Sequence, residues 1–236
     1  MMLKWCRRLH NWLGLLLVIQ LLFWFTSGLV MSIMPIEQVR GEHLKAIPSV
    51  TWQSAVVSPA SVFKQHSPTA SMNWSQQISW QNDQLQAIPV YVITESTSLF
   101  RYSALTGELL APLTEGEIRR SAEAQYLGTG HLLDVQFLQV LPQEVHNLTP
   151  PLWQVTFADD DSTTFYLDPM TGMVARVRTF GWRVFDFFWM LHIMDYQDRS
   201  NFNNPLLIST AAASVLFTLT GIFMLWQRYR PRRLVR

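Results

Sequence analysis

Two histidines next to long apolar segments are the residues best suited to chemistry. His10 lies in RRLHNWLG and His192 in WMLHIMDY. Imidazole nitrogens bind metals and haem iron, and an ionisable residue inside a membrane is a functional candidate by default. His10 and Gly14 are one helical turn apart on one predicted face, so the small residue leaves room for a flat macrocycle. In the alternative interpretation His10, between Arg8 and Trp12, only anchors a helix end among the lipid headgroups.

Two segments without Asp, Glu, Lys or Arg must position these histidines. They are residues 12–34 and residues 206–226, and each exceeds the roughly 18 uncharged residues that indicate a membrane-spanning helix. The apolar run of the first is longer than that of a signal peptide, and no small-x-small cleavage site follows it. We therefore predict two transmembrane helices, the first of them an uncleaved anchor.

The charges on the two tails predict the orientation. Residues 1–11 contain Lys4, Arg7 and Arg8, residues 227–236 are rich in arginine, and neither tail contains an acidic residue. Lys and Arg next to spanning segments stay on the cytoplasmic side. Both termini of this two-pass protein are therefore predicted to be cytoplasmic, and the region between the helices is predicted to face outward.

Composition also restricts the partners. The basic tails are expected to contact anionic lipid of the bilayer. Nucleic acid is not expected, because every acidic residue lies in the exported region. That region has no cysteine, since Cys6 in the inner tail is the only one, so it has no disulfide, thiolate metal site or redox pair.

The two histidines are expected at opposite membrane faces. His10 precedes the first span at the inner face, and His192 precedes the second span at the outer face, so roughly 30 Å separates them. One chain therefore cannot hold a single haem between the two. In a dimer, His10 could meet its symmetry mate. His192 could meet its own mate, His131 or His146, or it could be an interfacial residue without a ligand role.

The exported region contains an internal repeat of about one helix and three or four antiparallel strands, over residues 48–112 and 113–179. Thr106-Gly107 aligns with Thr171-Gly172, and Ser103 aligns with Asp168. Each Thr-Gly pair predicts a tight turn with a positive φ at glycine, and Asp168 is expected to accept hydrogen bonds from backbone amides two residues on. Residues 48–179 are predicted to fold alone.

Other local patterns predict further elements. Ser58-Pro59 is typical of a helix start, and Thr114 with Glu117 forms a predicted capping box. The aromatic segment 180–204 is expected to lie in the membrane interface. The acidic run at 159–161 is interpreted as a solvated hairpin loop rather than a calcium site.

Small residues on the second span predict close helix packing. Four of them, at roughly four-residue spacing, are expected to pack against the first span around Gly14 and Gly28; they are Thr210, Ser214, Thr218 and Gly221. Gln20 lies near the middle of the first span and has no charged partner in sequence, which favours a hydrogen bond across a helix interface.

The motifs together resemble a known family. FYLDPMTGMVARV resembles the strand–Asp-x-x-Thr-Gly–strand hallmark of the PepSY domain. RLHNWLGLLLVIQLLFWFTSGLVM and FFWMLHIMDY with LFTLTGIFMLWQRYRP resemble the PepSY-associated transmembrane family. The resemblance implies an α+β membrane protein in which two helices flank two PepSY-like repeats. Many relatives have four spanning helices, and some of these are reductases thought to bind haem b through membrane histidines.

Three functions follow as hypotheses. The first is a non-catalytic membrane-anchored protein whose periplasmic region binds or modulates an exported peptide or protein, as the PepSY resemblance implies. The second is a b-type haem subunit of a membrane reductase linked to iron acquisition, with His10 and His192 as ligands. The third is an assembly subunit or homo-oligomer within a larger complex. No catalytic residue is assigned, because the sequence has no HExxH, GxSxG, phosphate-loop or dinucleotide motif.

Overall fold

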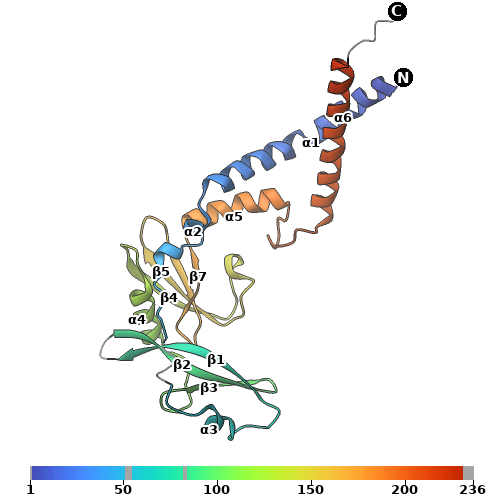
Figure 1. The fold of residues 1–236 in the computed structure, drawn as a ribbon. Helices are drawn as coiled ribbons and strands as arrows, with labels where there is room; N and C mark the ends of the chain where they lie inside the picture. The colour runs from blue at the N-terminus through green and yellow to red at the C-terminus, as the bar shows by residue number, and fades with distance from the viewer. Residues whose placement is uncertain (1, 51–54, 82–83, 231–236) are drawn as a thin grey trace, which may run out of the picture. The chain divides into compact units, whose positions relative to one another are not determined.

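The computed structural model describes residues 2–50, 55–81 and 84–230. The chain divides into two compact units. The helical unit contains the two ends of the chain, up to Pro35 and from Arg183, and the central unit contains Ile36–Trp182. The order of elements along the chain follows the colours of Figure 1.

The helical unit consists of α1 (Met2–Ile33), most of α5 (Phe180–Ile193) and α6 (Pro205–Tyr229). Both α1 and α6 are long and apolar enough to cross a membrane. Their most apolar windows are almost entirely uncovered by protein, with 11% and 0% of residues buried. Helices without a protein cover for such surface are typical of proteins that lie in a bilayer. The two helices at the chain ends therefore fit a two-pass membrane protein.

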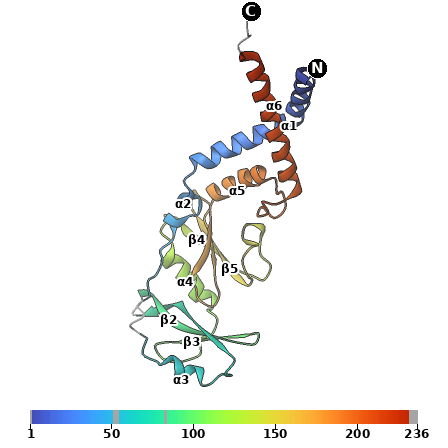
Figure 2. The ribbon, with the colours of Figure 1, turned by 45° about the vertical axis from the view of Figure 1, so that its right-hand side comes forward.

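The helices of this unit pack through a few close contacts. Leu17 is buried between α1 and its neighbours, and a Cβ at Gly14 would lie 3.0 Å from the Phe217 ring of α6. Figures 1 and 2 show α5 alongside the C-terminal half of α1. Trp24 of α1 fixes this pairing, because its indole N–H donates to the carbonyl oxygen of His192 over 2.8 Å.

The loop between α5 and α6 is ordered by its own side chains. The carboxylate of Asp195 accepts backbone N–H bonds from Gln197, Asp198, Ser200 and Asn201. These hydrogen bonds lower the pKa of Asp195, although desolvation opposes them. Asn204 then caps α6 by accepting from the Leu207 N–H at 2.8 Å. The chain therefore enters α6 from a fixed turn.

The central unit contains two antiparallel sheets with helices. The first is β1 (Ser71–Gln81), β2 (Gln84–Glu95) and β3 (Ser98–Ser103), preceded by the short α3 (Pro59–Phe63). The second follows α4 (Glu115–Gln125) and has the order β4 (His131–Leu138), β5 (Leu152–Ala158), β6 (Thr164–Leu167) and β7 (Val174–Arg178). The fold is thus α+β.

Two hydrophobic clusters hold these sheets. Ile118 and Ala122 on one face of α4 pack with Val155 and Phe165 of the second sheet. Val62 of α3 packs with Ile93 and its neighbours in the first sheet. The predicted capping box of α4 is confirmed, since Thr114 accepts from the Glu117 N–H and the Glu117 carboxylate accepts from the Thr114 N–H. Ser58 precedes α3 at the N-cap but makes no side-chain cap bond.

Two turns in the central unit have the same backbone geometry. Gly107 and Gly172 have φ values of 78° and 67°, and the N–H of each donates over 2.8 Å to the carbonyl four residues earlier. Asp168 Oδ1 accepts from two following backbone amides at 2.8 Å. The Ser103 hydroxyl accepts from two amides at 3.2 and 3.3 Å. The shorter neutral side chain therefore makes the same turn with longer bonds.

The segment that leads from α1 into the central unit is part of its core. It contains α2 (Ile36–Val39) and a 3-10 turn, Glu42–Leu44. Leu44 is buried in the cluster around Ile118, and the Leu127 N–H donates to its carbonyl at 2.9 Å. Gly41 has a φ of 67°, and a Cβ there would lie 2.5 Å from Val177 Cγ1 of β7. The first and last segments of the unit are therefore in contact.

We expect a fragment of residues 36–182 to be more stable than one of residues 48–182. The longer fragment keeps the buried Val39 and Leu44 side chains, which contribute about 2 kcal/mol or more. Urea denaturation followed by circular dichroism measures the difference. Equal midpoints for the two fragments would contradict this assignment of the segment.

Candidate functional site

His10 is held by two groups of the opposite helix. Its Nδ1 lies 2.9 Å from the Thr220 hydroxyl and 3.1 Å from the Phe217 carbonyl oxygen. Its ring is stacked on the Phe217 ring, with centroids 4.2 Å apart. Gly221 leaves space at the ring edge, because a Cβ there would lie 3.2 Å from His10 Cε1. These contacts fix the ring orientation and occupy one of its two nitrogens.

His192 has similar surroundings at the other end of α1. Its Nδ1 lies 2.9 Å from the Ser27 hydroxyl, and Ser27 is fully buried. A Cβ at Gly28 would lie 3.8 Å from His192 Cε1. Both histidines therefore have a hydroxyl at Nδ1 and a glycine beside Cε1. Ligand histidines commonly have one ring nitrogen bonded to a neighbouring group, which fixes the tautomer and leaves the other nitrogen for the metal.

The two histidines do not form one site. His10 of α1 contacts α6, and His192 of α5 contacts α1 at Ser27. The stretch of α1 from His10 to Ser27 spans about 26 Å. Within the described part of the chain, no three His, Cys, Asp or Glu side chains gather in a way that could hold a metal ion. Each level thus offers one histidine from this chain.

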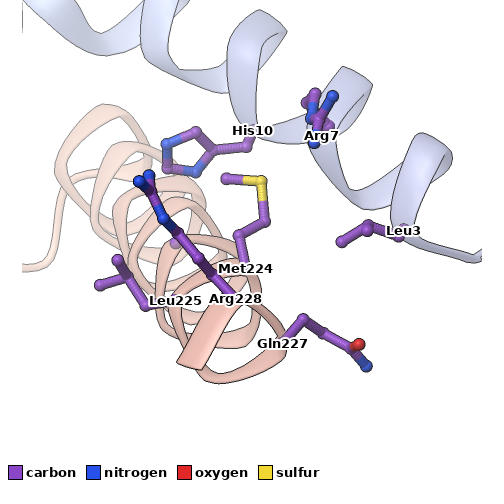
Figure 3. Close-up of a pocket in the computed structure, with 8 residues that line it drawn as sticks. Leu3, Arg7, His10, Met224, Leu225, Gln227 and Arg228 are labelled. Atoms are coloured by element: carbon purple, nitrogen blue, oxygen red, sulfur yellow. The ribbon is translucent and has the colours of Figure 1, made fainter. Parts of the chain in front are cut away.

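A cavity of about 710 Å³ opens beside His10 between α1 and α6. Figure 3 shows Met224 beneath the imidazole and the Arg228 side chain extending towards it. Arg7 and Leu3 of α1 also line the cavity. The cavity next to His10 therefore has both apolar and positively charged side chains in its lining.

The structure places most of the small residues of α6 towards its neighbours. Gly221 contacts His10 and Gly14 contacts Phe217, whereas Gly28 contacts His192 rather than α6. Thr210 and Ser214 are half-buried, but Thr218 is exposed and donates to the Ser214 carbonyl. Phe217 and Thr220 take the inward positions that a strict four-residue spacing assigns to Thr218. Spacing on a 3.6-residue helix drifts round the helix, and this explains the difference.

Among the described residues, three buried polar atoms of the helical unit have no hydrogen-bond partner. They are Gln20 Nε2 in α1, Arg199 Nε in the loop between α5 and α6, and Ser214 Oγ in α6. The predicted hydrogen bond from Gln20 across a helix interface is therefore not made by its amide nitrogen. The atoms of Gln20 and Ser214 mark the middle of the helical unit as a place where packing takes precedence over hydrogen bonding.

The central unit contains a buried histidine that the sequence patterns do not indicate. His66 Nδ1 lies 3.0 Å from Glu95 Oε2, and its Nε2 lies 3.0 Å from the Tyr102 hydroxyl. The His66 side chain is only 5% exposed and contacts the ring of Phe100. These residues come from three separate segments, so no local motif indicates them. The cluster fastens the segment after α3 to β2 and β3.

The Glu95 carboxylate should make the stability of the central unit sensitive to acid. Hydrogen bonds from His66 and from the Ser67 N–H hold the pKa of Glu95 below its ordinary value of 4.5. A depressed carboxylate contributes stability above the unfolded pKa, and this contribution is lost as the pH falls through the folded pKa. We expect the thermal midpoint of the central unit to fall below about pH 4.5, and to fall less in Glu95→Gln. Glu123→Gln, at an exposed position of α4, should keep the wild-type profile, and an equal loss in all three proteins would contradict this origin.

The acidic run after β5 is tied to the protein at its first residue. Asp159 accepts from the Tyr126 hydroxyl at 2.6 Å and from the Thr163 N–H at 2.8 Å. Burial opposes ionisation, but these hydrogen bonds hold the pKa of Asp159 below its ordinary value. Burial and then the Asp159 contact raise the pKa of Tyr126 to about 12. Asp159 therefore has a structural role in its hairpin.

Comparison with known proteins identifies a family. The family model described as the PepSY-associated TM region matches residues 3–228. No curated protein and no solved structure matches the chain.

Proposed function

The chain belongs to the PepSY-associated transmembrane family, and from this premise we propose that it is a b-type haem-binding subunit of a membrane electron-transfer system. His10 and His192 would each hold a haem through one ring nitrogen. Haem, when bound, supplies one-electron chemistry. The setting we propose is the bacterial inner membrane, with both termini cytoplasmic and the central unit periplasmic, because the tails are basic.

The matching surroundings of the two histidines support this proposal. At His10 and at His192, a hydroxyl of a packed helix is bonded to Nδ1, and a glycine faces Cε1. An interfacial histidine that only anchors a helix end needs neither feature. A ligand histidine uses both, because the hydroxyl orients the ring and the glycine makes room for the imidazole beside the neighbouring helix.

A second copy of the chain would complete each site. Each end of the helical unit offers one histidine, so a haem held there would take its second protein ligand from another chain. In a parallel homodimer, the two His10 residues meet near the inner face and the two His192 residues meet near the outer face. The helix faces available for such a contact are the uncovered sides of α1 and α6. The assembly would then have haem near both membrane faces, as electron transfer across a bilayer requires.

The test is a visible spectrum of the purified full-length protein, oxidised and then reduced with dithionite. We expect a Soret band with sharp reduced α and β bands, of which His10→Ala and His192→Ala each lose about half. The matched control is His43→Ala, at an exposed position of the central unit, which should keep the full spectrum. Colourless protein from haem-replete cells, or single variants with unchanged haem content, would refute the proposal. A haem-loaded species with the mass of one chain would refute the dimer.

The hydroxyl groups give a finer prediction. We expect Thr220→Val to weaken haem binding at the His10 level about tenfold, because the imidazole loses the group that orients it. Thr218→Val is the matched control, since Thr218 lies on the same helix but is exposed. Titration of the haem-free protein with haemin measures both affinities. Equal affinities would show that the Thr220 contact has no role in binding.

We also propose, as a second function, that the central unit binds an exported peptide or protein partner. Both of its sheets are open and antiparallel, with β1 and β3 at the edges of one and β4 and β7 at the edges of the other. Open edges offer backbone hydrogen bonds to an added strand. The test is a titration of the full-length protein with a defined extended peptide.

A further inference from the structure

We infer that the edge of β1 at Gln77–Trp80 is a binding site for an extended, uncharged peptide segment. The inference rests on the proposed partner-binding function and specifies where it occurs. A cavity of about 380 Å³ lies at this edge. Four consecutive residues of β1 line it, together with Ile88 of β2 and Leu110, Leu113, Glu117 and Arg120.

The lining of the cavity shows that it lies along the strand edge. Successive side chains of a strand point to opposite faces of the sheet. A single cavity that touches Gln77, Ile78, Ser79 and Trp80 therefore meets both faces, at the edge of β1 that has no neighbour among the described strands. The N–H of Ile78 already donates to the Thr171 carbonyl over 2.8 Å. This edge thus pairs with one chain segment at Ile78, and an added strand would continue the pairing towards Trp80.

A buried amide oxygen at the cavity lacks a partner among the described residues. Gln77 is 5% exposed, and its Oε1 accepts no hydrogen bond from the residues that the structure describes. A buried acceptor without a donor costs about 1–3 kcal/mol, which a ligand with an N–H group would recover. Gln77, which carries this unpaired oxygen, lines the cavity. A hydrogen-bond donor is therefore expected from a ligand in the cavity. A peptide N–H is such a donor.

The remaining lining favours an uncharged apolar ligand. Arg120 lies over the Trp80 ring, 4.3 Å from its centroid. The Glu117 carboxylate already accepts from the Thr114 N–H and hydroxyl. Both charges are thus engaged within the protein, while Ile78, Ile88 and Leu113 present apolar surface. Alternating apolar side chains on an extended backbone match this combination of surface, acceptor and strand edge.

The experiment uses the full-length protein in lipid nanodiscs, labelled with ¹⁵N at the tryptophan indoles. The probe is acetyl-Leu-Thr-Leu-Thr-amide, and its control is the same peptide with alternate amides N-methylated. We expect the first peptide to shift the Trp80 indole signal, which Trp80→Phe identifies, and the second to leave it unchanged. Gln77→Leu should raise the Kd about tenfold. The control Gln136→Leu, on the exposed side of β4, should leave the Kd as in wild type.

Three outcomes would contradict the proposed peptide site. No indole shift with millimolar peptide would refute both the site and the proposed partner-binding function of the central unit. Binding that shifts other indoles and is unaffected by Gln77→Leu would refute the site alone. Thermal denaturation verifies that Gln77→Leu is folded. If it is not, Ser79→Tyr fills the cavity from an adjacent position, and undiminished Trp80 shifts in that variant would equally refute the site.

Discussion

Gly172→Val is expected to destabilise the central unit by about 3 kcal/mol or more. Gly172 has a φ of 67°, which a β-branched residue adopts only with strain. Its new Cβ would lie 2.7 Å from Leu113 Cδ1 and 3.3 Å from Ile78 Cβ. The Gly172 carbonyl also accepts hydrogen bonds from the buried side chains of Ser121 and Gln125. The substitution therefore strains the backbone, overpacks the core and disturbs a buried network at one position.

Gly116→Ala is the matched control for this variant. Gly116 lies in the first turn of α4, and a Cβ there meets no atom within 4 Å. Replacing a helical glycine with alanine should stabilise the unit slightly, by about 0.5 kcal/mol. Urea titration of the detergent-solubilised protein, followed by tryptophan fluorescence, measures both changes. A Gly172→Val protein with a wild-type midpoint would show that the turn after Asp168 can relax without cost.

Phe165→Ala is expected to cost about 3–5 kcal/mol. The Phe165 side chain is fully buried and makes edge contacts with the rings of Tyr126 and Phe157, at centroid distances of 5.8 and 5.1 Å. Its removal leaves a cavity between α4 and the second sheet, because the surrounding strands restrict collapse. Few single substitutions of this chain should be as damaging.

The comparison variant is Leu133→Ala on β4, where the side chain is 59% exposed. Its loss should change the free energy of unfolding by no more than about 0.5 kcal/mol. The same urea titration gives both values. If the two variants differed by less than about 1 kcal/mol, the cluster around Ile118 would not be the main source of stability of the second sheet.

Local chemistry made part of the fold predictable. The Thr114 capping box and the Thr-Gly turns depend on residues within a few positions of one another, so their types and spacing are sufficient. The two apolar helices can also be predicted, because a membrane-spanning helix is recognised by its length and composition alone. Their observed bounds differ from the predicted ones: α1 begins at Met2, within the basic tail, and ends at Ile33, whereas α6 runs from Pro205 to Tyr229.

Contacts between distant segments were not predictable in the same way. His66 meets Glu95 and Tyr102 only because α3 and the first sheet fold together. The inward positions of Phe217 and Thr220 depend on the rotation of α6 about its axis, which spacing alone does not determine. Similarly, the hydroxyl partners of His10 and His192 lie on other helices. The histidines themselves could be selected from the sequence, but not the groups that orient them.

The contact between Gly41 and Val177 affects how easily the central unit can be replaced by another domain. The central unit begins and ends with neighbouring segments, so it joins the rest of the chain as a compact insertion with paired ends. Domains with neighbouring ends can replace loops in a host protein without separating the elements on either side. The two terminal helices could therefore be joined to a different central unit. The sequences of the helices and of the central unit could then vary separately.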